Sequence, residues 1–160
     1  MAKIMIVDFD DKVIGYKERG EELASDIYRV TALWVVNTSG DVLLAQRSFT
    51  KKKNPGIWAP AVAGTVDEGE TYDDNIVKET KEEIGIELSD YEKLEKRKPF
   101  GKYKHFTQWY RLVTDQKDFN FDKREIEQIK WFSIEELKNK VEKNPEQFFS
   151  TAKYCIENYC

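Results

Sequence analysis

The sequence predicts a mixed α/β sandwich, in which helices pack on the faces of a β-sheet. Strand-like segments come first, one amphipathic helix follows, more strands come after it, and the chain ends in helical segments. The hydrophobic period changes from two residues to about 3.6 residues and back along this order. No internal repeat, low-complexity tract or Pro/Gly/Ser-rich linker divides the 160 residues, so we expect a single domain over residues 1–160.

Runs rich in β-branched and aromatic residues alternate with turn sequences before the helix. An Asp-Phe-Asp-Asp turn closes an N-terminal hairpin predicted at about residues 4–15. A Thr-Ser-Gly-Asp turn joins the strands predicted over residues 29–37 and 42–47. Asn-Pro-Gly makes a further turn and leads into an apolar strand predicted over residues 58–63.

The central helix is predicted over residues 72–84. Thr71 is a good N-cap residue, and Asp73 and Asp74 occupy the first turn, where the helix dipole favours negative charge. Gly85 stands where a left-handed residue ends a helix. Both ends of this helix are therefore defined by local sequence.

Two further strands and two helices are predicted after the central helix. The strands fall at about residues 91–98 and 103–114, and an Ile-Lys-Trp-Phe strand precedes the C-terminal helices at about residues 133–158. The sequence from Ser133 to Glu136 has the form of a capping box, which predicts the start of the first C-terminal helix. Asn144-Pro145 predicts the start of the second, with proline in its first turn.

The composition excludes several classes of function. The 26 basic and 30 acidic side chains give a net charge of −4, which argues against a nucleic-acid polymer or an anionic membrane as partner. No apolar run approaches the roughly 18 residues of a membrane span, and we find no signal peptide. His105 is the only histidine, so a His-rich zinc site is excluded. Cys155 and Cys160 are expected to be free thiols of a cytoplasmic protein.

Three glutamates gather on one face of the central helix. At about 100° per residue, Glu79, Glu82 and Glu83 fall in one sector about 100° wide, whereas Ile76 and Ile84 lie outside it. Like charges at these spacings cost a few tenths of a kcal/mol per pair. Hard oxygen ligands around Mg²⁺ or Mn²⁺ would reverse that sign. Considered by itself, however, such a helix is more often a solvated acidic surface.

The segment around the helix resembles a known motif. Residues 64–86 read GTVDEGETYDDNIVKETKEEIGI, and the spacing of their glycines and glutamates resembles the Nudix box, which marks a family of diphosphate hydrolases. The resemblance implies a Nudix-type α/β/α sandwich with a mixed sheet and the box helix packed on it. Two positions depart from the family pattern. Lys78 replaces the usual arginine and loses its bidentate geometry, and Thr80 replaces a bulkier apolar residue.

The resemblance also implies roles for particular residues. It makes Glu79, Glu82 and Glu83 catalytic residues and Mg²⁺ ligands, with Mn²⁺ as an alternative ion. The resemblance also makes the Gly64 carbonyl a further metal ligand. It makes Glu70 a partner of Lys78, so that both residues support the ligands from behind. Glu82 is our first choice for the general base, and Glu125 and Glu127 are alternatives outside the box.

A second stretch narrows the resemblance to one branch of the family. Residues 47–58, RSFTKKKNPGIW, and the early hairpin look like the branch that also contains isopentenyl diphosphate isomerase. In that branch the residues matching Arg47 and Lys51 help to hold the substrate diphosphate, a suitable role for fixed cations. The alternative for Lys51 is a solvated turn.

Isomerase chemistry itself is not supported by this sequence. The resemblance places the isomerase cysteine at Ala63 and its companion histidine at Thr65. We therefore expect hydrolysis of a small-molecule diphosphate, either a nucleoside diphosphate derivative or a nucleotide. An isomerase-like enzyme and a non-catalytic nucleotide-binding module remain alternatives, and a homodimer is left open. Five aromatic residues are either core residues or a stacking surface for a base: Trp34, Trp58, Tyr103, Phe106 and Trp109.

Overall fold

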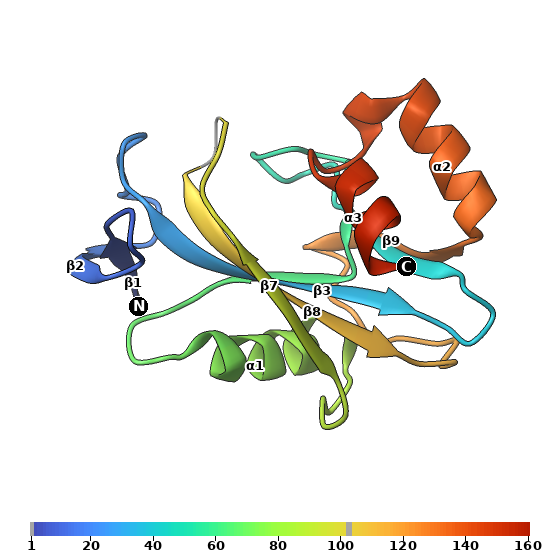
Figure 1. Ribbon diagram of the computed structural model, residues 1–160, viewed down its shortest axis with the longest axis horizontal. Coiled ribbons are helices and arrows are strands. Elements are labelled where there is room, and N and C mark those ends of the chain that lie inside the picture. The colour runs from blue at the N-terminus through green and yellow to red at the C-terminus, as the bar shows by residue number, and fades with distance from the viewer. Residues whose placement is uncertain (1, 102–103) are drawn as a thin grey trace.

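The computed structural model describes residues 2–101 and 104–160 (Figure 1). Its helices and strands follow the predicted order. They are β1 (Lys3–Val7), β2 (Val13–Glu18), β3 (Tyr28–Val36), β4 (Val42–Arg47), β5 (Trp58–Pro60), β6 (Val62–Thr65), α1 (Tyr72–Ile84), β7 (Glu92–Arg97), β8 (His105–Val113), β9 (Ile126–Phe132), α2 (Ile134–Lys143), a 3₁₀ turn η1 (Pro145–Gln147) and α3 (Ala152–Tyr159).

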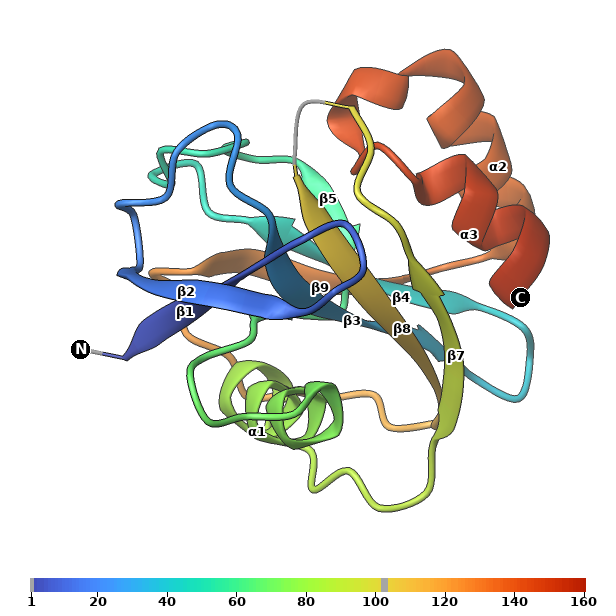
Figure 2. The same cartoon turned by 60° about the vertical axis from the view of Figure 1, so that its left-hand side comes forward.

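The described strands form a mixed sheet and a separate hairpin. The sheet has seven strands in the order β5-β4-β3-β8-β7, with β6 also paired to β3 and β9 paired to β4. The β3 and β8 strands are parallel, and the other pairs are antiparallel. Helix α1 covers one face of this sheet, and α2 and α3 cover the other (Figures 1 and 2). The predicted mixed α/β sandwich is confirmed.

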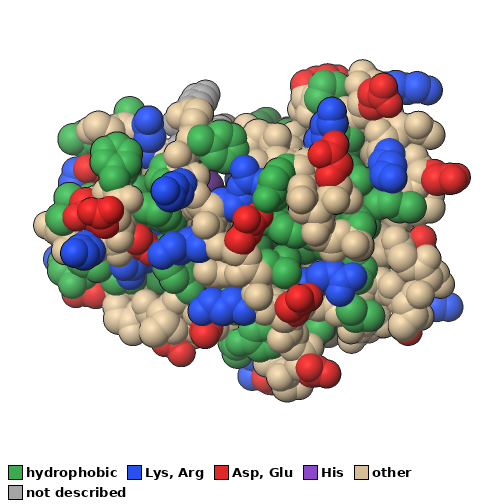
Figure 3. Space-filling view, viewed as in Figure 1, with side chains coloured by type: hydrophobic (Ala, Val, Ile, Leu, Met, Phe, Trp, Pro, Cys, Tyr) green, Lys and Arg blue, Asp and Glu red, His purple; other side chains and the backbone are tan. Residues whose placement is uncertain are grey.

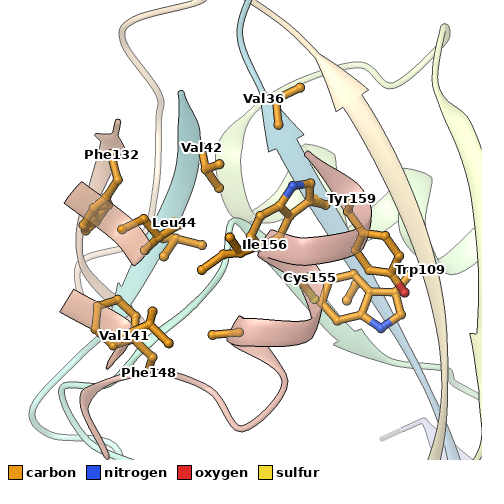
Figure 4. Packing of buried hydrophobic residues seen from close by; sticks show 14 residues of the cluster. Val36, Val42, Leu44, Trp109, Phe132, Val141, Phe148, Cys155, Ile156 and Tyr159 are labelled. Carbon is orange, nitrogen blue, oxygen red and sulfur yellow. The ribbon is translucent and has the colours of Figure 1, made fainter. Parts of the chain in front are cut away.

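Strand β3 lies in the centre of the sheet, and its side chains are buried on both faces. Leu33 and Val35 belong to the hydrophobic cluster beneath α1, whereas Trp34 and Val36 belong to the cluster beneath α2 and α3 (Figure 4). This alternation follows from the two-residue period of a strand. A central strand that is covered on both faces typically has a continuous apolar sequence, and the second half of β3 has one.

The β1–β2 hairpin is attached to the rest of the fold through Asp11, which has left-handed backbone geometry with φ of 61°. Its carboxylate accepts hydrogen bonds from Arg29 Nε (2.7 Å), Tyr72 Oη (2.9 Å) and Lys96 Nζ (2.7 Å). Burial opposes ionisation of Asp11, but the three donors outweigh it and lower the pKa of the carboxyl group. One side chain thus joins the hairpin to β3, α1 and β7.

Helix α1 begins and ends where the sequence predicts. The Thr71 side chain accepts from the Asp74 backbone N–H, and the Asp74 side chain accepts from the Thr71 backbone N–H. Gly85 ends the helix with a left-handed φ of 73°. Ile76 and Ile84 are fully buried against the sheet. These contacts fix the rotation of the helix about its axis, and with it the direction of its acidic face.

Two predicted elements differ in the structure. The strand predicted over residues 58–63 is divided at Ala61, so that β5 pairs with β4 and β6 pairs with β3. The helix predicted from Pro145 is wrong, because only the short turn η1 forms before the chain becomes extended at Phe148. The Phe149 N–H donates to the Trp58 carbonyl (2.9 Å) and Phe148 is buried. Tertiary contacts therefore delay the helix until Ala152.

The distribution of charged side chains and the state of the two cysteines agree with what the composition predicts. Basic and acidic side chains alternate over the face in Figure 3, without a continuous basic area there. No helix within residues 2–101 or 104–160 is long and apolar enough to cross a membrane. Cys155 is buried and Cys160 is exposed, and both are free thiols, as predicted.

Candidate functional site

A cavity of about 670 Å³ lies beside the C-terminal half of α1. The described residues that line it come from the hairpin, β3–β6, α1 and the segment before β9. They are Arg19, Val30, Ala45, Arg47, Lys51, Ala59, Pro60, Ala63, Gly64, Thr65, Glu79, Glu82, Glu83, Asp122, Glu125 and Ile126. The three box glutamates and Gly64 thus share one cavity with Arg47 and Lys51.

Gly64 and Glu79 are in close contact. A Cβ atom built on Gly64 would lie 2.4 Å from Glu79 Cγ and 2.6 Å from Glu79 Cδ. Cβ atoms do not lie within 3.0 Å of other, non-bonded heavy atoms, so any side chain at residue 64 would force the Glu79 side chain to move. The lack of a side chain at residue 64 therefore creates the space that the Glu79 carboxylate occupies.

Glu83 and Glu79 form a half-buried carboxyl pair. The two carboxyl groups are close enough to shift each other's pKa, and the Ala63 backbone N–H favours the charged form of Glu83. Burial is the largest cause that raises the pKa of both groups, and the like charge of the neighbour raises the pKa of Glu83 further. The pair therefore holds a proton more strongly than an exposed carboxyl group would.

The donor set of this pair fits a hard cation. The Glu83 Oε2 atom is buried and has no hydrogen-bond partner among the described residues, an unfavourable state for a carboxylate oxygen. Carboxylate and carbonyl oxygens are the ligands that Mg²⁺ and Mn²⁺ prefer. Within the described part of the chain, no three Asp, Glu, His or Cys side chains are preassembled around one point as metal ligands. Glu82 lies on the exposed side of the same cavity.

Lys78 is shared among three carboxylates. Its Nζ atom lies 2.7 Å from Glu70 Oε2, 3.1 Å from Asp67 Oδ2 and 3.8 Å from Glu79 Oε1. Burial alone would lower the pKa of Lys78, but Glu70 and Asp67 raise it above its ordinary value. Glu70 is held in turn by the Asn75 side-chain amide (3.1 Å). A lysine point charge thus contacts several oxygens where an arginine fork would bind one carboxylate.

Cations line the other part of the cavity. Lys51 forms an ion pair with Glu125, and both line the cavity. Arg47 Nε donates to the Lys53 carbonyl (3.0 Å), which holds the guanidinium group against the turn. Of the two alternative carboxylates outside the box, Glu125 lines the cavity, whereas Glu127 is exposed on β9 and is not among the lining residues.

Three charged residues in or beside the cavity were missed by the sequence reasoning: Arg19, Asp67 and Asp122. Arg19 follows β2, and its Nη2 atom lies 2.9 Å from Asp67 Oδ1. Arg19 and Asp122 line the cavity. No local pattern marks Arg19 and Asp122, because folding brings them to the box from segments far away in the sequence. For Asp67, the signal in the sequence was a carboxylate within the box segment itself.

Most of the aromatic candidates belong to the core. Trp34, Phe106 and Trp109 have relative exposures of 1%, 3% and 3%, so they present no free face to a base. Trp58 packs edge-on against Phe132 with ring centroids 4.9 Å apart. Tyr103 lies outside the described residues. The core interpretation therefore holds for the three buried rings.

Comparison with known protein families and curated proteins adds to this geometry. A family model described as NUDIX domain matches residues 27–152. Isopentenyl-diphosphate Delta-isomerases of Salmonella heidelberg and Salmonella agona are each 30% identical over 89 residues, which cover 54% of this chain and 49% of the relative. The chain spans about half the length of the curated relatives it matches.

Solved structures share the fold. DR0079 from Deinococcus radiodurans has a TM-score of 0.85 at 23% identity, with 97% of each chain covered. A MutT Nudix hydrolase from Burkholderia pseudomallei has a TM-score of 0.68 at 18% identity, covering 84% of this chain and 98% of that one. The Nudix domain of Shewanella oneidensis NrtR, complexed with ADP ribose, has a TM-score of 0.59 at 14% identity, covering 78% and 82%.

Proposed function

Because this chain belongs to the Nudix domain family, we propose that it is a Mg²⁺-dependent hydrolase that cleaves a diphosphate linkage in a small molecule. One observation carries the proposal. The half-buried Glu79–Glu83 pair shares a cavity with Arg47 and Lys51, and its Glu83 Oε2 atom is buried without a hydrogen-bond partner among the described residues. Such a cavity offers carboxylate oxygens to a divalent cation and positive charge to phosphate groups, which a diphosphate with its cation requires.

Glu79, Glu82, Glu83 and the Gly64 carbonyl are the proposed ligands. A divalent ion held there would neutralise diphosphate oxygens and lower the pKa of a bound water. Mg²⁺ and Mn²⁺ both fit this set of oxygen donors. The close contact between Gly64 and Glu79 supports the assignment, because both residues line the same cavity.

The chain's own residues supply the remaining parts of the reaction. Glu82 is the proposed general base, because it is the exposed member of the three glutamates and can accept a proton from water. Arg47 and Lys51 would bind phosphate oxygens and balance the charge that develops on them. Glu70 and Asp67 hold Lys78, which limits how far the box can move.

The relatives named as isomerases make isomerase chemistry the competing proposal. Ala63 and Thr65 occupy the positions of the isomerase cysteine and histidine, and both line the cavity. Neither side chain can exchange a proton with an alkene carbon as a thiol or an acid can. Hydrolysis is therefore favoured, and ADP ribose, the ligand of the NrtR domain, supports nucleoside diphosphate derivatives as the first substrates to test.

The test is phosphate or nucleotide release from ADP ribose, nucleoside di- and triphosphates and isopentenyl diphosphate, with Mg²⁺ and with a chelator. Glu83→Gln should lower the best activity by more than about a hundredfold, since loss of an outer partner of a metal site alone costs about 10- to 100-fold. The matched control is Glu87→Gln, a glutamate after α1 that is paired with Lys81 on the surface. Equal, metal-independent release by wild type and Glu83→Gln would refute hydrolysis at this site. Isomerisation of isopentenyl diphosphate without phosphate release would establish the competing proposal.

A further inference from the structure

Asp67 lies between two cations at the edge of the cavity. Its Oδ1 atom accepts a hydrogen bond from Arg19 Nη2 (2.9 Å), and its Oδ2 atom accepts one from Lys78 Nζ (3.1 Å). The side chain is 16% exposed. Both carboxylate oxygens are thus engaged, one with a residue of the cavity wall and the other with the lysine that departs from the family pattern.

The backbone of Asp67 is fixed from two sides. Its N–H donates to Glu70 Oε1 (2.7 Å) within the box. On the other side, Asp67 forms a β-bridge with Ile4, and the next residue, Glu68, donates its N–H to the Lys3 carbonyl (2.7 Å). The hairpin therefore lies beside the segment that leads into α1 (Figure 2). A carboxylate on such a backbone has little freedom to move.

Arg19, in contrast, has few restraints of its own. It follows the last residue of β2, and its side chain is 54% exposed. Its only hydrogen-bond acceptors among the described residues are Asp67 and the Thr65 carbonyl, the latter at 3.5 Å. A long side chain with one strong partner keeps its position only while that partner is present, because solvent offers the guanidinium group many other positions.

Asp67 is also a closer partner of Lys78 than the box glutamate Glu79 is. Lys78 Nζ lies closer to Asp67 and Glu70 than to Glu79, at 3.1 and 2.7 Å against 3.8 Å. Without the Asp67 carboxylate, Lys78 would lose one of its two close partners and could approach Glu79. Glu79 would then have less negative charge to offer to a cation.

We propose that Asp67 is a positioning residue that directs Arg19 to a phosphate group of the bound diphosphate. This inference rests on the proposed function. Its second oxygen holds Lys78 beside Glu70, which compensates for the loss of the arginine fork at residue 78. Arg19 is the side chain that contacts the phosphate, and Asp67 acts through it.

The test is a double-mutant cycle read by binding. Isothermal titration calorimetry measures the affinity of inorganic diphosphate in Mg²⁺ for wild type, Asp67→Asn, Arg19→Gln and the double variant. Each single variant should weaken binding about fivefold, the size of one partly exposed charged contact. The double variant should lose less affinity than the two single losses combined, because Asp67 then has no arginine to direct and only its contact with Lys78 remains to be lost. Additive losses, or an unchanged affinity in Asp67→Asn, would overturn the proposal.

Two variants separate positioning from general loosening of the hairpin. Asp26→Asn is the matched control, since Asp26 is 15% exposed and pairs with Lys17 of the same hairpin. It should leave diphosphate affinity unchanged, and a loss equal to that of Asp67→Asn would show that the effect is only structural. Asp67→Glu keeps the charge and should lose less affinity than Asp67→Asn. The same cycle is run with Asp67→Glu if the asparagine variant does not unfold cooperatively.

Binding and hydrolysis are read separately. If wild type binds diphosphate but cleaves no substrate, the proposed hydrolysis fails while the cycle still decides the role of Asp67. If wild type hydrolyses substrates and Asp67→Asn keeps its KM and diphosphate affinity, the role of Asp67 fails alone. If wild type binds no diphosphate in Mg²⁺, Arg19 has no phosphate to contact and the positioning role is refuted.

Discussion

Gly64 and Glu79 touch across the boundary between β6 and α1, and a methyl group on residue 64 would occupy the place of the Glu79 side chain. Gly64→Ala should therefore displace Glu79 without straining the backbone, because Gly64 has no left-handed φ. A displacement of about 1 Å in a catalytic group costs about a hundredfold, and we expect a loss in kcat/KM of that size. Gly15→Ala is the control, since its added Cβ meets nothing within 4 Å. Similar kcat/KM values for the two variants would contradict this role of Gly64.

Mg²⁺ should stabilise the folded protein through the same glutamates. A ligand at about a hundred times its Kd adds about 2.7 kcal/mol to the free energy of unfolding. In a chain of this size, that raises Tm by about 5–10 °C. Thermal unfolding with and without Mg²⁺ measures the shift. Glu79→Gln and Glu83→Gln should abolish it, whereas Glu87→Gln should keep it. A shift that survives in both site variants would place the ion elsewhere.

The ion pair between Lys51 and Glu125 should compete with substrate. Glu125→Gln removes a negative charge from the cavity and frees Lys51, so KM should fall by up to about fivefold, the limit for an exposed ion pair worth about 1 kcal/mol. Lys51→Ala should raise KM instead. Steady-state kinetics of both variants on the same substrate provide the measurement. A collapse of kcat in Glu125→Gln, with KM unchanged, would make Glu125 the general base in place of Glu82.

Asp11 should make stability depend on pH. Because its folded-state pKa lies below the ordinary value of 3.8, its contribution is present above pH 3.8 and is lost as pH falls through the folded-state pKa. Asp11→Asn tolerates the left-handed backbone and should lower the free energy of unfolding at pH 7 by about 1.5–3 kcal/mol, the range of hydrogen bonds to charged groups. The difference from wild type should shrink below pH 3.8.

Urea unfolding at pH 7 and pH 3 tests that dependence. Asp90→Asn, a substitution of an exposed aspartate, should change stability by less than about 0.5 kcal/mol at both pH values. A constant difference between wild type and Asp11→Asn at the two pH values would show that the carboxylate charge of Asp11 does not carry the effect.

The elements that were predicted correctly are those whose ends depend on neighbouring residues. Thr71, Asp74 and Gly85 define both ends of α1 through contacts within a few positions, so the sequence contains the whole cause. The division of the apolar run at Ala61 has a different cause. Pro60 ends β5 and has no N–H to continue a ladder, but the neighbour with which each half pairs, β4 or β3, is set by distant strands. The helix expected at Pro145 fails for the same reason, because Phe148 is buried.

The candidate site shows the same division between local and distant causes. The glutamates of α1 and their partner Gly64 are close in sequence, and one motif contains them. Arg19 meets Asp67 across 48 positions, and Lys51 meets Glu125 across 74. Such contacts follow from the docking of the hairpin and of the segment before β9 against the sheet. The positions of charged residues along the sequence identify these side chains as candidates, but they do not show which of them form ion pairs.

Strand β3 separates the two large hydrophobic clusters, which share its backbone but not their side chains. The cluster beneath α1 supports the glutamates, whereas the cluster around Trp34 and Phe132 lies across the sheet from them. Substitutions on the two sides should combine additively, because separated sites without shared partners rarely influence each other. Directed evolution could therefore repack the side beneath α2 and α3 for heat resistance while the cavity is diversified for new substrates.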